Sequence, residues 1–100
     1  MYNGKVYRGD IGTALKLYTG VDLTGASALQ IFVKKPSGAE EIWYAGVDSE
    51  DPKTMVHICT GSNLDESGEY LVQAFARFRG GTGWAGRGQT ASFFVYEPWT

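Results

Sequence analysis

Residues 69–79 form the longest stretch of this chain in which two kinds of side chain alternate cleanly. Successive side chains of a β-strand point to opposite faces, so the stretch predicts one strand with two distinct faces. One face carries small and apolar residues, namely Tyr70, Val72, Ala74, Ala76 and Phe78. The other face carries Leu71, Gln73, Phe75, Arg77 and Arg79, a mixture that exposure to solvent alone does not explain. We therefore expect the fold to be organised around this strand, with its first face in the core.

Six further segments combine short length, alternating apolar residues and flanking turn residues. They are residues 2–7, 13–18, 28–34, 40–45, 55–60 and 89–96. In the second of them the alternation places Thr13, Leu15 and Leu17 on an inward row that Ile11 would extend. Turn signals recur about every 8–12 residues, without helical periodicity of useful length. The pattern predicts an all-β, immunoglobulin-like antiparallel β-sandwich of about seven strands.

The connecting segments have recognisable roles. Lys35–Gly38 is expected to form a hairpin turn, because proline suits its first turn position and glycine its last. Gly46–Lys53 is acidic and predicts a solvated loop, whereas Leu23 is expected to plug one end of the core. The crossing before Tyr70 resembles the tyrosine corner of immunoglobulin-like sandwiches. A single cysteine, Cys59, excludes an intrachain disulfide, so Tyr70 is predicted to fix this corner in its place.

Length and charge restrict the function. One hundred residues predict a single domain spanning 1–100. A formal net charge of −2 argues against general attraction to nucleic acid or an anionic membrane surface. The amino end lacks an apolar leader, and no apolar run approaches the roughly 20 residues of a membrane span. We expect a soluble domain made in the cytosol.

Two patterns look catalytic or cofactor-binding but have simpler explanations. Gly81–Gly86 matches the dinucleotide fingerprint G-x-G-x-x-G, yet that motif needs a helix after it, and here a strand is expected. His57 and Cys59 share one strand face, where neighbours lie roughly 6–7 Å apart, too far for a nucleophile and its base. The sequence has no other His or Cys to complete a zinc site. We therefore expect Gly81–Gly86 to form a hairpin tip, and His57 and Cys59 to lie on a part-buried strand face.

Three acidic or receptor-like patterns are equally weak. The acidic residues of 48–51 lack the spacing of a calcium-binding loop. Glu40 and Glu41 are adjacent on a strand and face opposite sides, so they cannot act together on one substrate. Arg8–Asp10 matches an integrin-type tripeptide, but Gly9 and Asp10 are explained by the turn that they are expected to form. We therefore predict no catalytic residues, no metal and no cofactor, and a protein that is not an enzyme.

Apolar residues on the face opposite the core are the strongest functional signal. Phe32, Leu71 and Phe75 are predicted there, with Phe94 and Tyr96 as further candidates. Two explanations stay open: cover by the amino-terminal strand or a loop, or an oligomer or assembly interface.

Trp84 stands beside a glycine-rich tip, with other aromatic residues elsewhere in the chain. It is expected to pack over a sandwich end or against a partner. The alternative is that it stacks on a sugar ring, which would make the chain a carbohydrate-binding module contacting host glycans.

Three short segments together resemble a known family. They read G-D-I-G-T at 9–13, V-D-L-T-G-A at 21–26 and V-K-K-P-S-G at 33–38, and G-E-Y-L-V-Q-A at 68–74 is also similar. These segments resemble small immunoglobulin-like domains of tailed-bacteriophage virions, nearest to the amino-terminal domain of baseplate upper and related tail-associated proteins.

The resemblance implies a non-enzymatic virion component, made in the host cytoplasm, that docks on other virion proteins or on copies of itself. A baseplate or tail accessory protein, a connector or a capsid decoration would each fit, without nucleic-acid or membrane binding. The residues expected to make the contacts are Phe32, Leu71, Phe75, Arg77 and Trp84.

Overall fold

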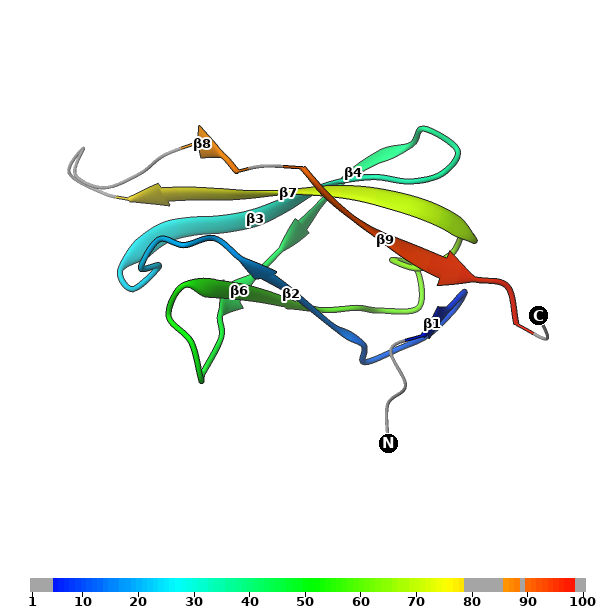
Figure 1. Cartoon of the computed structure of the whole chain (residues 1–100), viewed down its shortest axis with the longest axis horizontal. Coiled ribbons are helices and arrows are strands. Elements are labelled where there is room, and N and C mark those ends of the chain that lie inside the picture. The colour runs from blue at the N-terminus through cyan, green and yellow to red at the C-terminus, as the bar shows by residue number, and fades with distance from the viewer. Residues whose placement is uncertain (1–4, 79–85, 89, 99–100) are drawn as a thin grey trace.

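The computed structural model describes residues 5–78, 86–88 and 90–98. Within them nine strands form two sheets that face each other (Figure 1). The larger sheet has the order β1-β9-β7-β3-β4, with β8 paired to β7. Its strands are β1 (Val6–Tyr7), β3 (Ala26–Lys34), β4 (Glu40–Tyr44), β7 (Gly68–Phe78), β8 (Gly86–Arg87) and β9 (Ala91–Tyr96). The smaller sheet has the order β2-β6-β5, with β2 (Ala14–Tyr18), β5 (Gly46–Val47) and β6 (Thr54–Ile58).

The fold is an all-β, immunoglobulin-like β-sandwich, as predicted. Every strand pair is antiparallel except β1 with β9, which is parallel. Each of the seven predicted strand segments contains an observed strand, and β5 and β8 are two further strands of two residues each. The loop predicted at Gly46–Lys53 therefore begins with a strand, because Gly46 and Val47 pair with Val56 and Met55 of β6.

Strand β7 is central, with β3 on one side and β9 on the other (Figure 1). Its inward residues are buried as predicted: Tyr70, Val72, Ala74 and Ala76 are at most 7% exposed. Small side chains at positions 74 and 76 let the facing sheet approach closely, since an alanine projects little beyond the backbone. The position of β7 between two long partners explains why its alternation is the clearest in the chain.

The core fills the space between the sheets with residues from both of them. Ile31 and Val33 come from β3, and Met55 comes from β6. Leu23 is fully buried and belongs to the same cluster, which confirms the predicted plug. Burying each such aliphatic side chain contributes about 1.5–3 kcal/mol, so this cluster is the main source of stability in a domain without a disulfide.

The inward row on β2 is shorter than predicted. Leu15 and Leu17 pack against the core, but Ile11 is 78% exposed and does not extend their row. The reason is the turn before the strand: Gly12 has a φ of +87°, which breaks the extended backbone between Ile11 and the strand. The prediction for Ile11 was wrong.

The tyrosine corner is present. The Tyr70 hydroxyl donates a hydrogen bond to the Glu66 carbonyl at 2.8 Å and accepts one from the Glu66 N–H at 3.1 Å. The Tyr70 ring also stacks on Phe93 of β9, with 5.1 Å between ring centres. Burial raises the pKa of Tyr70, against the opposing effect of the Glu66 hydrogen bond. The corner fixes the start of β7 against the crossing segment and against β9.

Candidate functional site

The outer face of the larger sheet brings together most of the residues predicted to contact a partner. Phe32 of β3 lies opposite Gln73 of β7, one step along the outer row from Phe75. The Phe32 and Phe75 rings are 5.6 Å apart in an edge-to-face arrangement. The Arg77 guanidinium carbon lies 5.7 Å from the centre of the Phe75 ring, within reach of a cation–π interaction.

Two other predicted contact residues have different outcomes. Leu71 is 39% exposed on the same outer face, as predicted. Trp84 lies outside the described residues, and so do residues 81–85 of the glycine-rich motif. Gly86, the last glycine of that motif, pairs with Ala76 in a strand, as expected for a hairpin and not for a nucleotide-binding helix.

The sequence prediction missed two residues of this face, Ile42 and Tyr44 of β4. They are 48% and 73% exposed, whereas Trp43 between them is buried. The signal was in the run E-E-I-W-Y, since alternation around an inward tryptophan puts its neighbours outward. Phe94 on β9 is 51% exposed, and its ring lies edge-on to that of Tyr96 at 4.9 Å. The apolar outer face therefore extends across β4, β3, β7 and β9.

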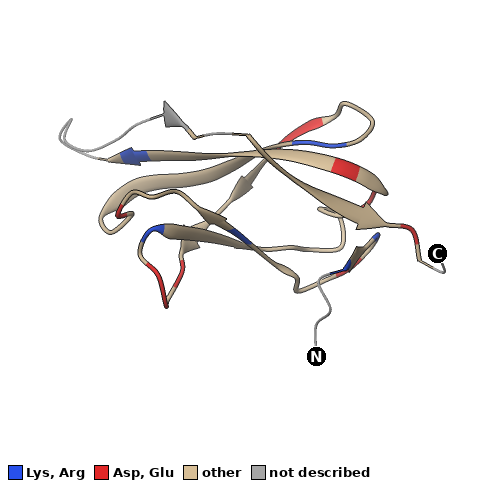
Figure 2. Ribbon diagram, viewed as in Figure 1, with Lys and Arg blue, Asp and Glu red and all other residues tan. Residues whose placement is uncertain are grey.

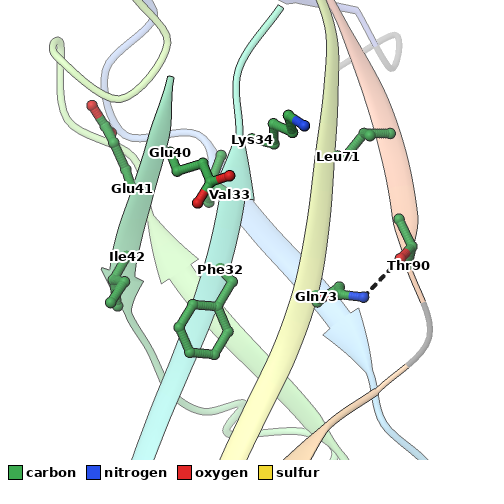
Figure 3. A pocket seen from close by; sticks show the side chains of 9 residues that line it. All are labelled: Phe32, Val33, Lys34, Glu40, Glu41, Ile42, Leu71, Gln73 and Thr90. Atoms are coloured by element: carbon green, nitrogen blue, oxygen red, sulfur yellow. Dashed lines mark hydrogen bonds between the residues drawn. The ribbon is translucent and has the colours of Figure 1, made fainter. Parts of the chain in front are cut away.

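A groove of about 530 Å³ lies on this face over β4, β3 and β7 (Figure 3). Phe32 and Leu71 form apolar parts of its lining, and Lys34 and Glu40 stand opposite each other on β3 and β4. On the far side Gln73 donates a hydrogen bond from Nε2 to Thr90 Oγ1 at 2.8 Å. The lining combines an apolar surface with polar groups at its margin, which suits contact with a protein side chain or a sugar.

A buried lysine holds the hairpin that borders the groove. Lys35 is 4% exposed, and its ammonium lies 2.7 Å from Asp65, 2.9 Å from Glu41 and 3.3 Å from the Ser62 carbonyl. Burial lowers the pKa of Lys35, but hydrogen bonds and charge from Asp65 and Glu41 outweigh it, so the pKa is raised. Sequence reasoning treated this lysine only as a turn residue, because no local pattern shows that Asp65, far along the chain, converges on it together with Glu41.

His57 and Cys59 have structural contacts. The His57 ring stacks on Trp43 at 5.0 Å, with Nδ1 2.7 Å from the Tyr44 carbonyl and Nε2 2.7 Å from Asn63 Oδ1. Cys59 is 2% exposed, and burial raises the pKa of its thiol to about 11. A buried thiol held in its protonated form is a poor nucleophile. Both residues stabilise the sandwich where the two sheets meet.

The acidic loop and the integrin-type tripeptide also make turn contacts. Asp51 accepts hydrogen bonds from the Lys53 N–H and the Thr54 hydroxyl. Asp10 accepts one from the Tyr7 N–H at 2.9 Å, and Arg8 pairs with Glu97. Across residues 5–78, 86–88 and 90–98, no three His, Cys, Asp or Glu side chains are grouped to hold a metal ion. In the same part of the chain, no helix has the length and apolar character needed to cross a membrane.

Comparison with protein-family models, with curated proteins and with solved structures found no match to this chain. The fold and the outer face described above are therefore the basis for a functional proposal.

Proposed function

We propose that this protein is a non-enzymatic structural component of a tailed-bacteriophage virion that acts by docking its larger sheet on neighbouring virion subunits. A tail or baseplate accessory, a connector and a capsid decoration are all consistent with that role. The observation that carries the proposal is the apolar outer face of the larger sheet, on its central strands. The resemblance of segments 9–13, 21–26, 33–38 and 68–74 to virion domains supports the biological setting.

The composition of this face suits a protein partner. Aromatic residues and arginine are enriched at the energetic centres of protein interfaces. Aromatic rings bury much area with few rotatable bonds, and the planar guanidinium group both stacks on rings and donates several hydrogen bonds. The Phe32–Phe75 pair with Arg77 over Phe75 is such a group. Strand β7 carries its charged residues, Glu69 and Arg77, near its two ends, which leaves the middle of the sheet uncharged (Figure 2). An uncharged centre with charged margins costs little desolvation on docking.

The first test is the substitution Phe75→Asp, followed by quantification of the protein in purified particles. A carboxylate at the centre of the face would be buried without a partner on docking, so we expect at least a tenfold loss of incorporation. The matched control is Tyr18→Asp on β2, because Tyr18 is 69% exposed on the other sheet. Thermal unfolding of both purified variants checks that the fold is intact. Wild-type incorporation of a folded Phe75→Asp variant would contradict the proposal.

The groove supports a second candidate function, a carbohydrate-binding module that contacts host surface glycans. Its apolar lining at Phe32 and Leu71 and its polar groups at Gln73 and Thr90 are the kind of surface on which a sugar ring packs. Binding of host glycans in isothermal titration calorimetry, lost in Gln73→Ala, would favour this function. An assembly protein would show no such binding and would still enter particles.

A further inference from the structure

Strand β4 forms an open edge of the larger sheet. It is the last strand in the order β1-β9-β7-β3-β4 and pairs only with β3 in the described part of the chain (Figure 1). Just before the strand, the Lys35 N–H donates to the Ala39 carbonyl at 2.8 Å, and just after it, the Ala45 N–H donates to the Leu29 carbonyl at 3.1 Å. Backbone groups of alternate residues point to opposite sides of a strand.

The alternation assigns the backbone groups along β4. Ala39 and Ala45 bond to β3, and so do the alternate residues between them. Glu41 and Trp43 therefore direct their N–H and C=O groups toward β3. Glu40, Ile42 and Tyr44 direct theirs away from the sheet. Among these outward groups the Tyr44 carbonyl meets the His57 ring, whereas no described strand pairs with Ile42 on that side.

This edge has only part of the protection that prevents strand addition. Natural edge strands are protected by charged side chains, especially lysine, by proline, by a bulge or by a covering segment, and the charges of β4, Glu40 and Glu41, both lie at its hairpin end. Residues 40–44 contain no proline or lysine, and their register with β3 is unbroken. Ile42 and Tyr44 are 48% and 73% exposed beside the edge. A regular apolar edge of this kind is a template for another strand.

We propose that β4 pairs antiparallel with β4 of a second copy of this chain, around a twofold axis at Ile42. In this register Ile42 of each copy faces Ile42 of the other, and Glu40 faces the second copy's Tyr44. The two larger sheets then form one continuous sheet. Because Ile42 lies beside Phe32 on the outer face, the apolar row Phe32–Ile42 continues across the axis into the same row of the second copy.

With a second copy as the partner, the charges of β4 select this register. With the axis at Ile42, each Glu40 meets a tyrosine and each Glu41 meets a tryptophan, so no two carboxylates are opposed. A two-residue shift toward the hairpin would place the two Glu41 side chains opposite each other, which is destabilising. A one-residue shift would turn the outer faces of the two copies to opposite sides of the sheet. In this register the strand is complementary to itself: the outward groups of the two Ile42 residues pair at the axis, and the Tyr44 carbonyl, which already contacts the His57 ring, has its second lone pair for the Glu40 N–H of the second copy.

Sedimentation equilibrium of the purified chain tests the dimer. We expect the wild-type protein to dimerise as its concentration approaches about 1 mM, because one short strand pair forms a weak interface. Ile42→Lys should raise the dissociation constant at least about tenfold, since a lysine on an edge strand opposes pairing. The matched control, Ile58→Lys, should leave it unchanged, because Ile58 is 57% exposed but lies on the central strand of the smaller sheet. A monomeric wild-type protein, or equal effects of the two substitutions, would overturn the proposal.

Disulfide trapping tests the register. Paired Cα atoms of adjacent strands lie about 4.5–5.5 Å apart, within disulfide range, so oxidised Ile42→Cys should give a covalent dimer. Glu40→Cys alone should give none, because the two Glu40 positions lie four residues apart along the strands, about 13 Å. Mixing Glu40→Cys with Tyr44→Cys should restore the cross-link. Cross-linking of Glu40→Cys with itself would refute the register. These measurements use purified protein only, so their outcome is independent of whether the chain enters virions.

Discussion

Tyr70 contributes to the fold through its hydroxyl group as well as its ring. The hydroxyl contacts both the N–H and the C=O of Glu66, four residues earlier in the chain. Because the side chain is fully buried, neither backbone group has water as a ready substitute if the hydroxyl is removed.

We predict that Tyr70→Phe lowers the free energy of unfolding by about 1–2 kcal/mol, since it leaves part-buried backbone groups unpaired while preserving the ring. Urea denaturation followed by tryptophan fluorescence would measure the change. Tyr44→Phe is the control, because Tyr44 is largely exposed and its loss should stay within about 0.5 kcal/mol. Equal stability of Tyr70→Phe and wild type would show that the corner hydroxyl contributes nothing.

At the scale of elements, the β3–β4 hairpin is attached to the segment that precedes β7. Glu66 accepts hydrogen bonds from the Ser37 N–H and the Ser37 hydroxyl, both at 2.9 Å. Gly38 closes the hairpin turn with a φ of +94°, as its position in the sequence predicted. Gly68 has a φ of +125°, and a Cβ there would lie 2.9 Å from the Pro36 ring. The contact between the hairpin and the start of β7 therefore requires glycine at position 68.

We predict that Gly68→Ala destabilises the protein by about 1–3 kcal/mol, because it combines a strained backbone with a clash against a rigid proline ring. The control is Gly46→Ala on β5, where a Cβ would meet no atom within 4 Å. Thermal unfolding of the two variants would compare them. If Gly68→Ala melted at the wild-type temperature, the hairpin would be able to move away from the new Cβ without loss of stability, and the prediction would be wrong.

For the whole molecule, the charges around Lys35 make stability depend on pH. Glu41 accepts a hydrogen bond from the Trp43 indole N–H at 2.9 Å and pairs with Lys35. The Trp43 hydrogen bond is the largest cause that holds the pKa of Glu41 below its usual value of 4.5, against the opposing effect of burial. A carboxyl group that is more acidic in the folded state stabilises the fold fully above its unfolded pKa. That stability is lost as the pH falls through the lower, folded pKa.

We expect unfolding free energies measured between neutral pH and about pH 3 to fall below about pH 4.5, and to fall less steeply in Glu41→Gln. Glutamine carries no charge to be neutralised, so position 41 no longer contributes to the loss of stability at acidic pH. Glu40→Gln is the matched control, because Glu40 is exposed on the outer face. If the unfolding free energies of Glu41→Gln and the wild type fell in parallel with pH, the assignment of this acid dependence to Glu41 would be wrong.

Local rules were enough to predict most of the architecture. The alternation in β7 identified its buried face, and turn residues such as Gly38 marked where strands end. The same alternation placed Phe32, Leu71 and Phe75 on the outer face. These predictions needed only the two-residue period of a strand and the conformational freedom of glycine, which nearby sequence determines.

Features that depend on distant contacts were not predicted. Lys35 is buried where Glu41 of β4 and Asp65 of the segment before β7 converge on its ammonium. That convergence is not encoded within a short window of residues. The error for Ile11 has a different, local cause: the positive φ of the neighbouring Gly12 interrupts the extended backbone between Ile11 and the strand, although the spacing of Ile11 fits the inward row.

The sequence by itself determined the sandwich, its central strand and the two kinds of face, because side-chain alternation is a local property of an extended chain. Only the tertiary structure decided which strand stands at the edge, and that Ile42 and Tyr44 join the apolar face there. The physical reason is that strand order and register arise from pairing between segments far apart in the chain. The surfaces on which both functional proposals depend exist only after that pairing is complete.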